Sequence, residues 1–250
     1  MLKSVSLSLL LSLVAGLWSS TAMSATVMTV LVTGANRGIG LEMVKQMEAR
    51  GFEVIGTARN PDTATELKAT GAEVLALDVT DAESVAALTA ALDGRKIDML
   101  INNAGTGGQR VSSFPEYDFD RMKQTFDVNT FGPMRVTQAL LPNLEKGKVK
   151  TVVSVSSVMA SIERNGGGAY GYRASKTALN MLNSSLAKEY AEAGFTCVVV
   201  HPGWVRTRMG GEQAPVSTED SVKGLMDVFA GLSTDDNGKF YDFQGEEIPW

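Results

Sequence analysis

The sequence has few of the side chains that build disulfides and metal centres. It contains one cysteine, Cys197, and one histidine, His201, among 250 residues. A single cysteine excludes an intramolecular disulfide, and the apolar run Thr196–Val200 predicts that Cys197 is an inert thiol in a buried strand. His201 has no cysteine or acidic residue at ligand spacing, so the sequence predicts no metal site.

Positive charge is also scarce. The chain has 23 Lys and Arg against 28 Asp and Glu, which gives a net charge of −5 and an isoelectric point near 5.1. No basic stripe interrupts this balance, so nucleic acid is not an expected partner. Hydrophobic residues make up 44% of the chain, which is an ordinary share for a globular protein, and the length fits one α/β domain.

The longest apolar run lies at the N-terminus. Lys3 precedes a mostly apolar stretch, Val5–Trp18, and small residues follow it. Residues 1–25 thus have the layout of a secretory signal peptide, which would send the protein to the periplasm or outside the cell. An uncleaved anchor is a second interpretation, although the run is short for a membrane span. A third is a true start at Met23 or Met28, which would leave the catalytic domain cytoplasmic, without stable membrane association.

From Met28 onward, short apolar runs alternate with amphipathic segments. This alternation, without hairpin signals, favours a parallel sheet covered by helices on both faces. We therefore predict one α/β domain over residues 28–250, a doubly wound Rossmann-type sheet of about seven strands that binds its ligand at the strands' carboxyl ends. The expected strands are 29–33, 53–57, 74–77, 98–101, 151–156, 195–200 and 239–243, and the expected later helices are 61–67, 118–131, 133–144, 170–193 and 218–232.

A glycine-rich loop joins the first expected strand to the first helix. Its three glycines let the backbone turn tightly and approach a pyrophosphate, and the helix N-terminus that follows offers free N–H groups. The spacing is G-x-x-x-G-x-G, which differs from the usual G-x-G-x-x-G dinucleotide fingerprint. The candidate phosphate-binding residues are Thr33, Gly34, Asn36, Arg37, Gly38, Ile39 and Gly40.

The end of the second strand indicates which cofactor the loop takes. An NAD site usually has an acidic residue there, which accepts hydrogen bonds from the ribose hydroxyls. This strand instead ends in Thr57-Ala58-Arg59-Asn60. Arg59 and Arg37 can clamp a 2′-phosphate, so the sequence predicts NADP(H) rather than NAD(H). Two solvated surface arginines are the alternative.

Tyr172 and Lys176 share one face of a helix at i and i+4. An ammonium group beside a phenol lowers its pKa, so the tyrosine can give a proton to a carbonyl oxygen as hydride arrives. Ser154, Ser156 and Ser157 end the fifth strand, where a hydroxyl can hydrogen-bond a developing alkoxide.

Taken in order, these motifs resemble the short-chain dehydrogenase/reductase superfamily across about residues 28–250. The matching blocks are the glycine-rich loop, Asp78, Asn102-Asn103-Ala104-Gly105, Asn129, Ser157 with Tyr172 and Lys176, and Pro202-Gly203. The resemblance implies a catalytic set of Ser157, Tyr172, Lys176 and Asn129, in which Asn129 holds a water that links the lysine to solvent. The implied cofactor-binding residues beyond the loop are Arg59, Asp78, Val79, Asn103, Ala104, Gly105, Tyr172, Lys176, Pro202, Gly203, Val205 and Thr207.

The spacing between serine and tyrosine departs from the family pattern. The stretch from Ser157 to Tyr172 is longer than usual and includes Gly166–Gly168. Tyr170 would restore the spacing, but Ala174 stands four residues after it, so Tyr172 is chosen. The longer loop resembles the C-factor and Sniffer-type carbonyl reductase branch.

This resemblance implies an NADPH-dependent reductase that acts on a small carbonyl compound. Two alternatives stay open: an NAD-linked alcohol dehydrogenase on the same site, and a cofactor-binding signalling or sensor protein of the C-factor type. Trp204, Met209 and the loop 166–169 are candidates for the substrate pocket, and 209–216 is a candidate lid. Trp204 fits core packing equally well. Monomer and homodimer both remain possible, since the Tyr172 helix carries a polar-looking surface of Asn180, Asn183, Ser184 and Lys188.

Overall fold

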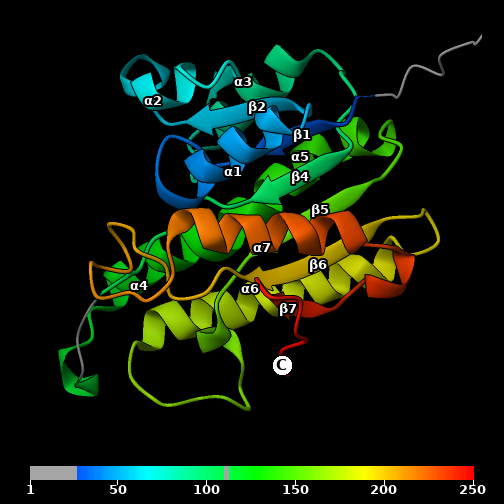
Figure 1. Ribbon diagram of the computed structural model, residues 1–250. Helices are drawn as coiled ribbons and strands as arrows, with labels where there is room; N and C mark the ends of the chain where they lie inside the picture. The colour runs from blue at the N-terminus through cyan, green and yellow to red at the C-terminus, as the bar shows by residue number, and fades with distance from the viewer. Residues whose placement is uncertain (1–26, 110–112) are drawn as a thin grey trace, which may run out of the picture.

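The computed structural model describes residues 27–109 and 113–250, and they form three layers, a sheet between two sets of helices (Figure 1). All neighbouring strands are parallel, in the order β3-β2-β1-β4-β5-β6-β7. This confirms the predicted doubly wound sheet of seven strands. The strands are β1 Thr29–Val32, β2 Glu53–Ala58, β3 Glu73–Ala76, β4 Met99–Asn102, β5 Thr151–Val155, β6 Thr196–His201 and β7 Phe240–Asp242.

Helices cover both faces of the sheet. The helices α1 Gly38–Ala49, α2 Thr65–Lys68 and α7 Thr218–Gly231 bury one apolar cluster against it. The helices α3 Ala82–Leu92, α5 Gly132–Glu145 and α6 Tyr170–Glu189 bury a second cluster on the other face (Figure 1). The helix α4 Phe119–Phe126 packs against α6. Short 3-10 turns are η1 Pro61–Thr63, η2 Phe114–Glu116, η4 Val158–Ala160 and η5 Thr234–Asp236.

The signal-like segment 1–25 lies outside the described residues. Within 27–109 and 113–250, no helix has both the length and the apolar character that a bilayer crossing requires. The same part of the chain holds no group of three or more His, Cys, Asp or Glu side chains that could bind a metal ion.

The predicted helices 118–131 and 133–144 form one continuous helical run. A π-turn, Asp127–Phe131, joins α4 to α5, and the N–H of Gly132 bonds to the carbonyl of Asp127 five residues back. Pro133 starts no new helix, because it sits in the first turn of α5, where the ladder is already shifted and a missing N–H costs little. The predicted helix 61–67 is also shorter than expected, since η1 and α2 divide it.

The expected polar surface on α6 is wrong for two of its residues. Asn180 and Asn183 are buried and face β5, where they accept hydrogen bonds from the hydroxyls of Ser156 at 2.7 Å and Ser154 at 3.0 Å. The two serine hydroxyls thereby satisfy the buried amide oxygens of Asn180 and Asn183. Met181 instead faces solvent and is 67% exposed.

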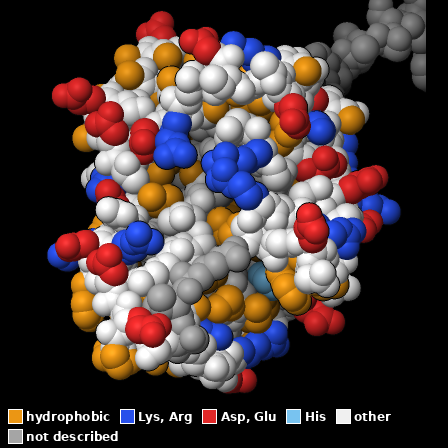
Figure 2. All heavy atoms as spheres, turned by 90° about the vertical axis from the view of Figure 1, so that its left-hand side faces the viewer, with side chains coloured by type: hydrophobic (Ala, Val, Ile, Leu, Met, Phe, Trp, Pro, Cys, Tyr) orange, Lys and Arg blue, Asp and Glu red, His pale blue; other side chains and the backbone are white. Residues whose placement is uncertain are grey.

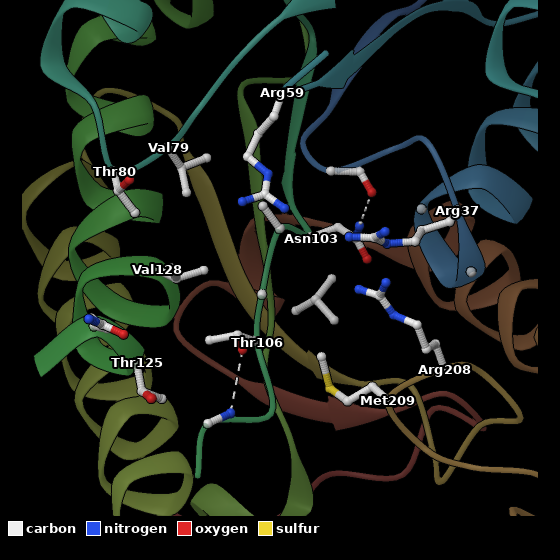
Figure 3. Close-up of a pocket in the computed structure, with 18 of the residues that line it drawn as sticks. Arg37, Arg59, Val79, Thr80, Asn103, Thr106, Thr125, Val128, Arg208 and Met209 are labelled. Carbon is white, nitrogen blue, oxygen red and sulfur yellow. Dashed lines mark hydrogen bonds between the residues drawn. The ribbon is translucent and has the colours of Figure 1, made fainter. Parts of the chain in front are cut away.

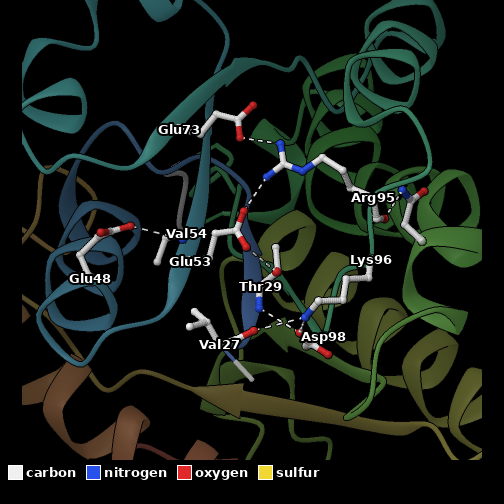
Figure 4. A network of polar contacts seen from close by, with 10 residues as sticks. Val27, Thr29, Glu48, Glu53, Val54, Glu73, Arg95, Lys96 and Asp98 are labelled. Atoms are coloured by element: carbon white, nitrogen blue, oxygen red, sulfur yellow. Dashed lines mark hydrogen bonds and ion pairs between the residues drawn. The ribbon is translucent and has the colours of Figure 1, made fainter. Parts of the chain in front are cut away.

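A polar network ties the strands together at their amino ends (Figure 4). Arg95 bridges Glu53 of β2 and Glu73 of β3, at 2.9 and 2.6 Å. The buried carboxylate of Asp98 accepts from the backbone N–H of Thr29 at 2.9 Å. It also accepts from Lys96 Nζ and the Lys148 N–H, both at 2.8 Å.

Burial alone would raise the pKa of Asp98. The hydrogen bond from Lys96, with those from the backbone of Thr29 and Lys148, outweighs burial and holds the pKa below its ordinary value. This edge of the sheet is therefore filled with paired charges, and the opposite edge carries the cleft.

Candidate active site

A cleft of about 1130 Å³ opens at the carboxyl edge of the sheet. Figure 2 shows this face as hollowed, with Lys and Arg side chains beside the hollow. Most of the residues that the sequence assigned to a cofactor or to catalysis meet in its wall. They are Gly34, Asn36, Arg37, Gly38, Ile39, Gly40, Arg59, Asp78, Val79, Asn103, Ala104, Gly105, Tyr172, Lys176, Pro202 and Thr207.

The other predicted site residues stand behind this wall. Thr33, Val205 and Asn129 are buried, and Gly203 is half-buried in a turn beside Phe243. The hydroxyl of Thr33 accepts the N–H groups of Asn103 and Ala104, both at 3.0 Å. Thr33 therefore holds the loop after β4 in place. Motif matching cannot tell such a supporting residue from one that contacts the ligand directly.

The glycines of the β1–α1 loop are required by close contacts. A Cβ added at Gly34, whose φ is +63°, would lie 2.9 Å from the Cα of Ala104, and one at Gly40 would lie 2.5 Å from Asn103 Nδ2. That amide donates to the carbonyls of Thr33 and Gly34 at 2.9 and 3.1 Å, which holds the loop in place. Arg37 precedes α1 without a side-chain cap, so the first N–H groups of the helix are open to an anion.

Three arginines from separate loops converge on the cleft (Figure 3). Arg37 precedes α1, Arg59 follows β2 and Arg208 lies between β6 and α7. None of them forms an ion pair with a carboxylate in the part of the chain that the structure describes. Partial burial, the positive charge of Arg208 and that of Arg59 together lower the pKa of Arg37. The cleft is therefore a site for a strongly negative ligand.

Tyr172 and Ser157 meet at the junction of β5 and α6. Tyr172 lies in the first turn of α6, and its side chain is hydrogen-bonded to that of Ser157. Burial raises the pKa of Tyr172, and the hydrogen bond with Ser157 opposes this only in part. The expected lowering by Lys176 is not found, because its Nζ donates to the carbonyl of Val155 at 2.7 Å. Burial lowers the pKa of Lys176 to about 8.

Asn129 lies in the π-turn and braces the loop after β4. Its Oδ1 accepts the N–H of Thr106 at 2.8 Å, while its Nδ2 donates to the carbonyl of Thr106 at 2.9 Å and to Ser175 Oγ at 3.1 Å. A Cβ added at Gly105 would lie 3.4 Å from Asn129 Oδ1 and 3.6 Å from Lys176 Nζ. A side chain at position 105 would thus contact both Asn129 and Lys176.

The structure separates the two tyrosines that compete for the catalytic position. Tyr170 makes edge-to-face contacts with Phe114 and Tyr117, each with 5.2 Å between ring centroids. It thus belongs to an aromatic cluster outside the cleft wall, whereas Tyr172 lines the cleft. This arrangement supports the choice of Tyr172 over Tyr170.

Of the residues predicted to line the substrate pocket, Met209 and Trp204 differ in where the structure places them. Met209 lines the cleft, and its Cγ lies 3.4 Å from where a Cβ of Gly107 would be. Trp204 is neither core nor cleft wall, since it is 57% exposed and its Nε1 donates to the carbonyl of Gly210 at 2.9 Å. Lid movement of 209–216 stays a prediction.

Several cleft residues were missed by the sequence reasoning. Many come from α4 and the segments that flank it, which carry no motif of fixed spacing. Arg208 had a readable signal, because it is a cation directly after the last motif residue, Thr207. The missed residues are Asn60, Thr63, Leu77, Thr80, Thr106, Gly108, Gln109, Asp118, Asp120, Arg121, Gln124, Thr125, Val128, Val155 and Arg208.

Comparison with known proteins agrees with this geometry. C-signal of Myxococcus xanthus is 45% identical over 155 residues, 62% of this chain and 93% of that protein. A 1-hydroxy-2-glutathionyl-2-methyl-3-butene dehydrogenase of Rhodococcus sp. is 31% identical over 229 residues, 89% of this chain and 99% of its own. The NADPH-bound carbonyl reductase from chicken fatty liver superposes with a TM-score of 0.84 at 35% identity, covering 90% of this chain and 99% of the other.

The carbonyl reductase Sniffer of D. melanogaster has the same architecture, with a TM-score of 0.83 and 29% identity over 90% of this chain and 100% of the other. The family model for short chain dehydrogenases matches residues 28–217. The chain is a short-chain dehydrogenase/reductase, and thus an NAD(P)-dependent oxidoreductase.

Proposed function

We propose that this protein uses NADPH to reduce an aldehyde or ketone to an alcohol. The observation that carries the proposal is that one cleft joins a cationic phosphate end with Tyr172 and Lys176, and that Tyr172 is hydrogen-bonded to Ser157. The carbonyl reductase from chicken fatty liver has NADPH bound, and a carbonyl reductase from Pseudomonas aeruginosa was solved with NADP. These relatives support both the cofactor and the reaction.

The residues present fit this cofactor. Gly34 and Gly40 hold the phosphate loop close to the loop after β4, where a Cβ would collide with Ala104 or Asn103, and the open N-terminus of α1 supplies N–H donors. Arg37 and Arg59 would hold the 2′-phosphate, and no carboxylate ends β2 to repel it. Lys176 would hold the nicotinamide ribose. When bound, the cofactor supplies the hydride.

Tyr172 acts as the general acid in this reaction. Its hydroxyl proton passes to the carbonyl oxygen while the carbonyl carbon receives hydride, and the hydrogen bond with Ser157 stabilises the phenolate left behind. A raised phenol pKa keeps Tyr172 protonated at neutral pH, which is the form that reduction needs. Asn129 fixes the loop of Gly105 and Thr106 beside Lys176, where a water can relay the proton from solvent.

The first experiment measures oxidation of NADPH and NADH by the full chain with a panel of aldehydes, ketones and quinones. We expect turnover that prefers NADPH. Tyr172→Phe should lower kcat by about 10²- to 10⁴-fold with an unchanged Kd for NADPH, because only the proton donor is removed. Tyr170→Phe is the matched control, since it loses the same hydroxyl two residues away, outside the cleft wall.

Other outcomes separate the alternatives. Equal or better turnover with NADH would favour the NAD-linked dehydrogenase. The likeness to C-signal favours a signalling role as the second candidate. Tight NADPH binding without turnover of any carbonyl, or full activity in Tyr172→Phe, would support that role and overturn the catalytic assignment.

A further inference from the structure

Arg208 is a positively charged residue of the cleft that has no role in the proposed reaction. Its side chain is exposed, and within 27–109 and 113–250 no hydrogen bond or ion pair holds it. Figure 3 shows it pointing into the cleft beside Arg37. Two guanidinium groups so placed repel each other, and the charge of Arg208 is one of the causes that lower the pKa of Arg37. Such an arrangement is unfavourable unless an anion binds between the two groups.

The position of Arg208 is fixed by its neighbour Thr207. The Cγ2 of Thr207 lies 3.4 Å from where a Cβ of Gly38 would be, so the loop after β6 touches the N-terminus of α1. The Thr207 hydroxyl also accepts the N–H of Gly210 at 3.1 Å, which shapes the loop around Arg208. Arg208 is therefore held close to the phosphate loop, on the same side of the cleft as Arg37.

The cations divide between two ends of the cleft. Arg59 lies at the adenosine end, since its charge acts on Asp78 after β3. Arg208 and Met209 line a separate hollow of about 200 Å³ with residues 105–108, which adjoin Lys176. The positive charges of Arg208 and Arg59 both lower the pKa of Arg37, so Arg37 lies near both side chains. A ligand that runs from Arg59 towards Lys176 thus passes Arg37 and Arg208 on its way.

We propose that Arg208 binds the diphosphate of the cofactor, beside the N-terminus of α1. This rests on the proposed function, because it takes a nicotinamide dinucleotide as the ligand. A diphosphate carries two negative charges, and the N-terminus of α1 supplies only a partial positive charge. The planar guanidinium supplies a full positive charge and two parallel donors. It thereby neutralises a charge that the helix terminus alone leaves exposed.

This role differs from that of the other arginines in a measurable way. The diphosphate is common to NADPH and NADH, so Arg208 contributes to the affinity for both. Arg59, at the 2′-phosphate end, contributes to the affinity for NADPH alone. Removing Arg208 should thus weaken the binding of both cofactors by the same factor and leave the ratio of their Kd values unchanged.

The test measures Kd by fluorescence or calorimetric titration of the full chain with NADPH, NADH and ADP-ribose, at low and at high salt. ADP-ribose carries the diphosphate without the nicotinamide. The variants are Arg208→Met and Arg59→Met. Arg50→Met is the control, because Arg50 is an exposed arginine at the far end of α1 and its loss changes the net charge equally. Thermal unfolding of each variant checks that it folds.

We expect Arg208→Met to weaken all three ligands by about tenfold at low salt, and by less at high salt, where an exposed charge is screened. Arg59→Met should weaken NADPH alone, and Arg50→Met none. Unchanged binding in Arg208→Met, or a loss confined to NADPH, overturns the assignment to the diphosphate. If the unaltered protein binds no nicotinamide cofactor, the proposed function itself fails, and the two failures are thus distinguished.

Discussion

Replacing Lys176 by methionine should stabilise the fold while it removes activity. The ammonium group is 5% exposed, and burial lowers its pKa from 10.5 to about 8. That gap corresponds to a penalty of about 3 kcal/mol on the charged form in the folded state. Methionine has a similar length and no charge, so the penalty disappears. The hydrogen bond to Val155 is lost as well, at a cost of about 1 kcal/mol.

The difference in unfolding free energy between Lys176→Met and the unaltered protein changes sign as pH rises. Below pH about 8 the lysine is charged in both states, and the folded state bears the whole penalty. Between about 8 and 10.5 the folded protein has released the proton and the unfolded chain still binds it, so the unfolding free energy of the unaltered protein rises. We expect Lys176→Met to be about 2 kcal/mol more stable at neutral pH, and about 1 kcal/mol less stable above this range.

Urea unfolding across this pH range, with steady-state NADPH oxidation on the same samples, provides the assay. Lys188→Met is the control, since Lys188 is an exposed lysine near the end of the same helix. A constant difference between Lys176→Met and the unaltered protein at every pH would refute the reasoning, as would a variant that is less stable at neutral pH. Either result would mean that the ammonium is solvated in the folded state.

Two further predictions concern groups away from the reaction. Asp98→Asn should lower the unfolding free energy by about 2 kcal/mol, because an amide cannot accept from three donors at once. The stability that Asp98 contributes is present above its ordinary pKa of 3.8 and is lost as pH falls through the lower pKa of the folded state. In urea unfolding, the stability of the variant should therefore fall less steeply at acid pH than that of the unaltered protein. Equal urea midpoints for the two proteins at neutral pH would contradict this. Burial raises the pKa of the Cys197 thiol to about 12, so a thiol reagent should label the native protein far more slowly than the urea-unfolded chain, and rapid native labelling would show that β6 is accessible.

The parts of the site that could be predicted are those where chemistry fixes residue type and short spacing. The turn after β1 needs glycine at Gly34 and Gly40, because any Cβ there meets the loop after β4. The pair Tyr172 and Lys176 is visible because a helix places i and i+4 on one face. The parallel sheet with helices on both faces also followed from the alternation of strand and helix patterns.

The rest depended on contacts between distant segments. Spacing put Lys176 beside Tyr172 but did not show that its Nζ turns to the carbonyl of Val155. The helical pattern of α6 could not show that Asn180 faces inward, because its partner Ser156 lies directly after β5, far from α6 in the sequence. The sequence also could not show that Arg208 lies near the phosphate loop, because this depends on the contact between the loop after β6 and the start of α1.

The polar network at the amino edge has a consequence for how the family can diversify. Glu53, Glu73, Arg95 and Asp98 bind the strands to one another, and none of them lines the cleft. Mutations that alter substrate range at the carboxyl edge therefore leave these ties intact, and selection on chemistry and selection on folding act on separate positions. Exchange of the 204–216 segment, which contributes Thr207, Arg208 and Met209 to the cleft wall, between relatives is thus a practical route to new substrate preferences.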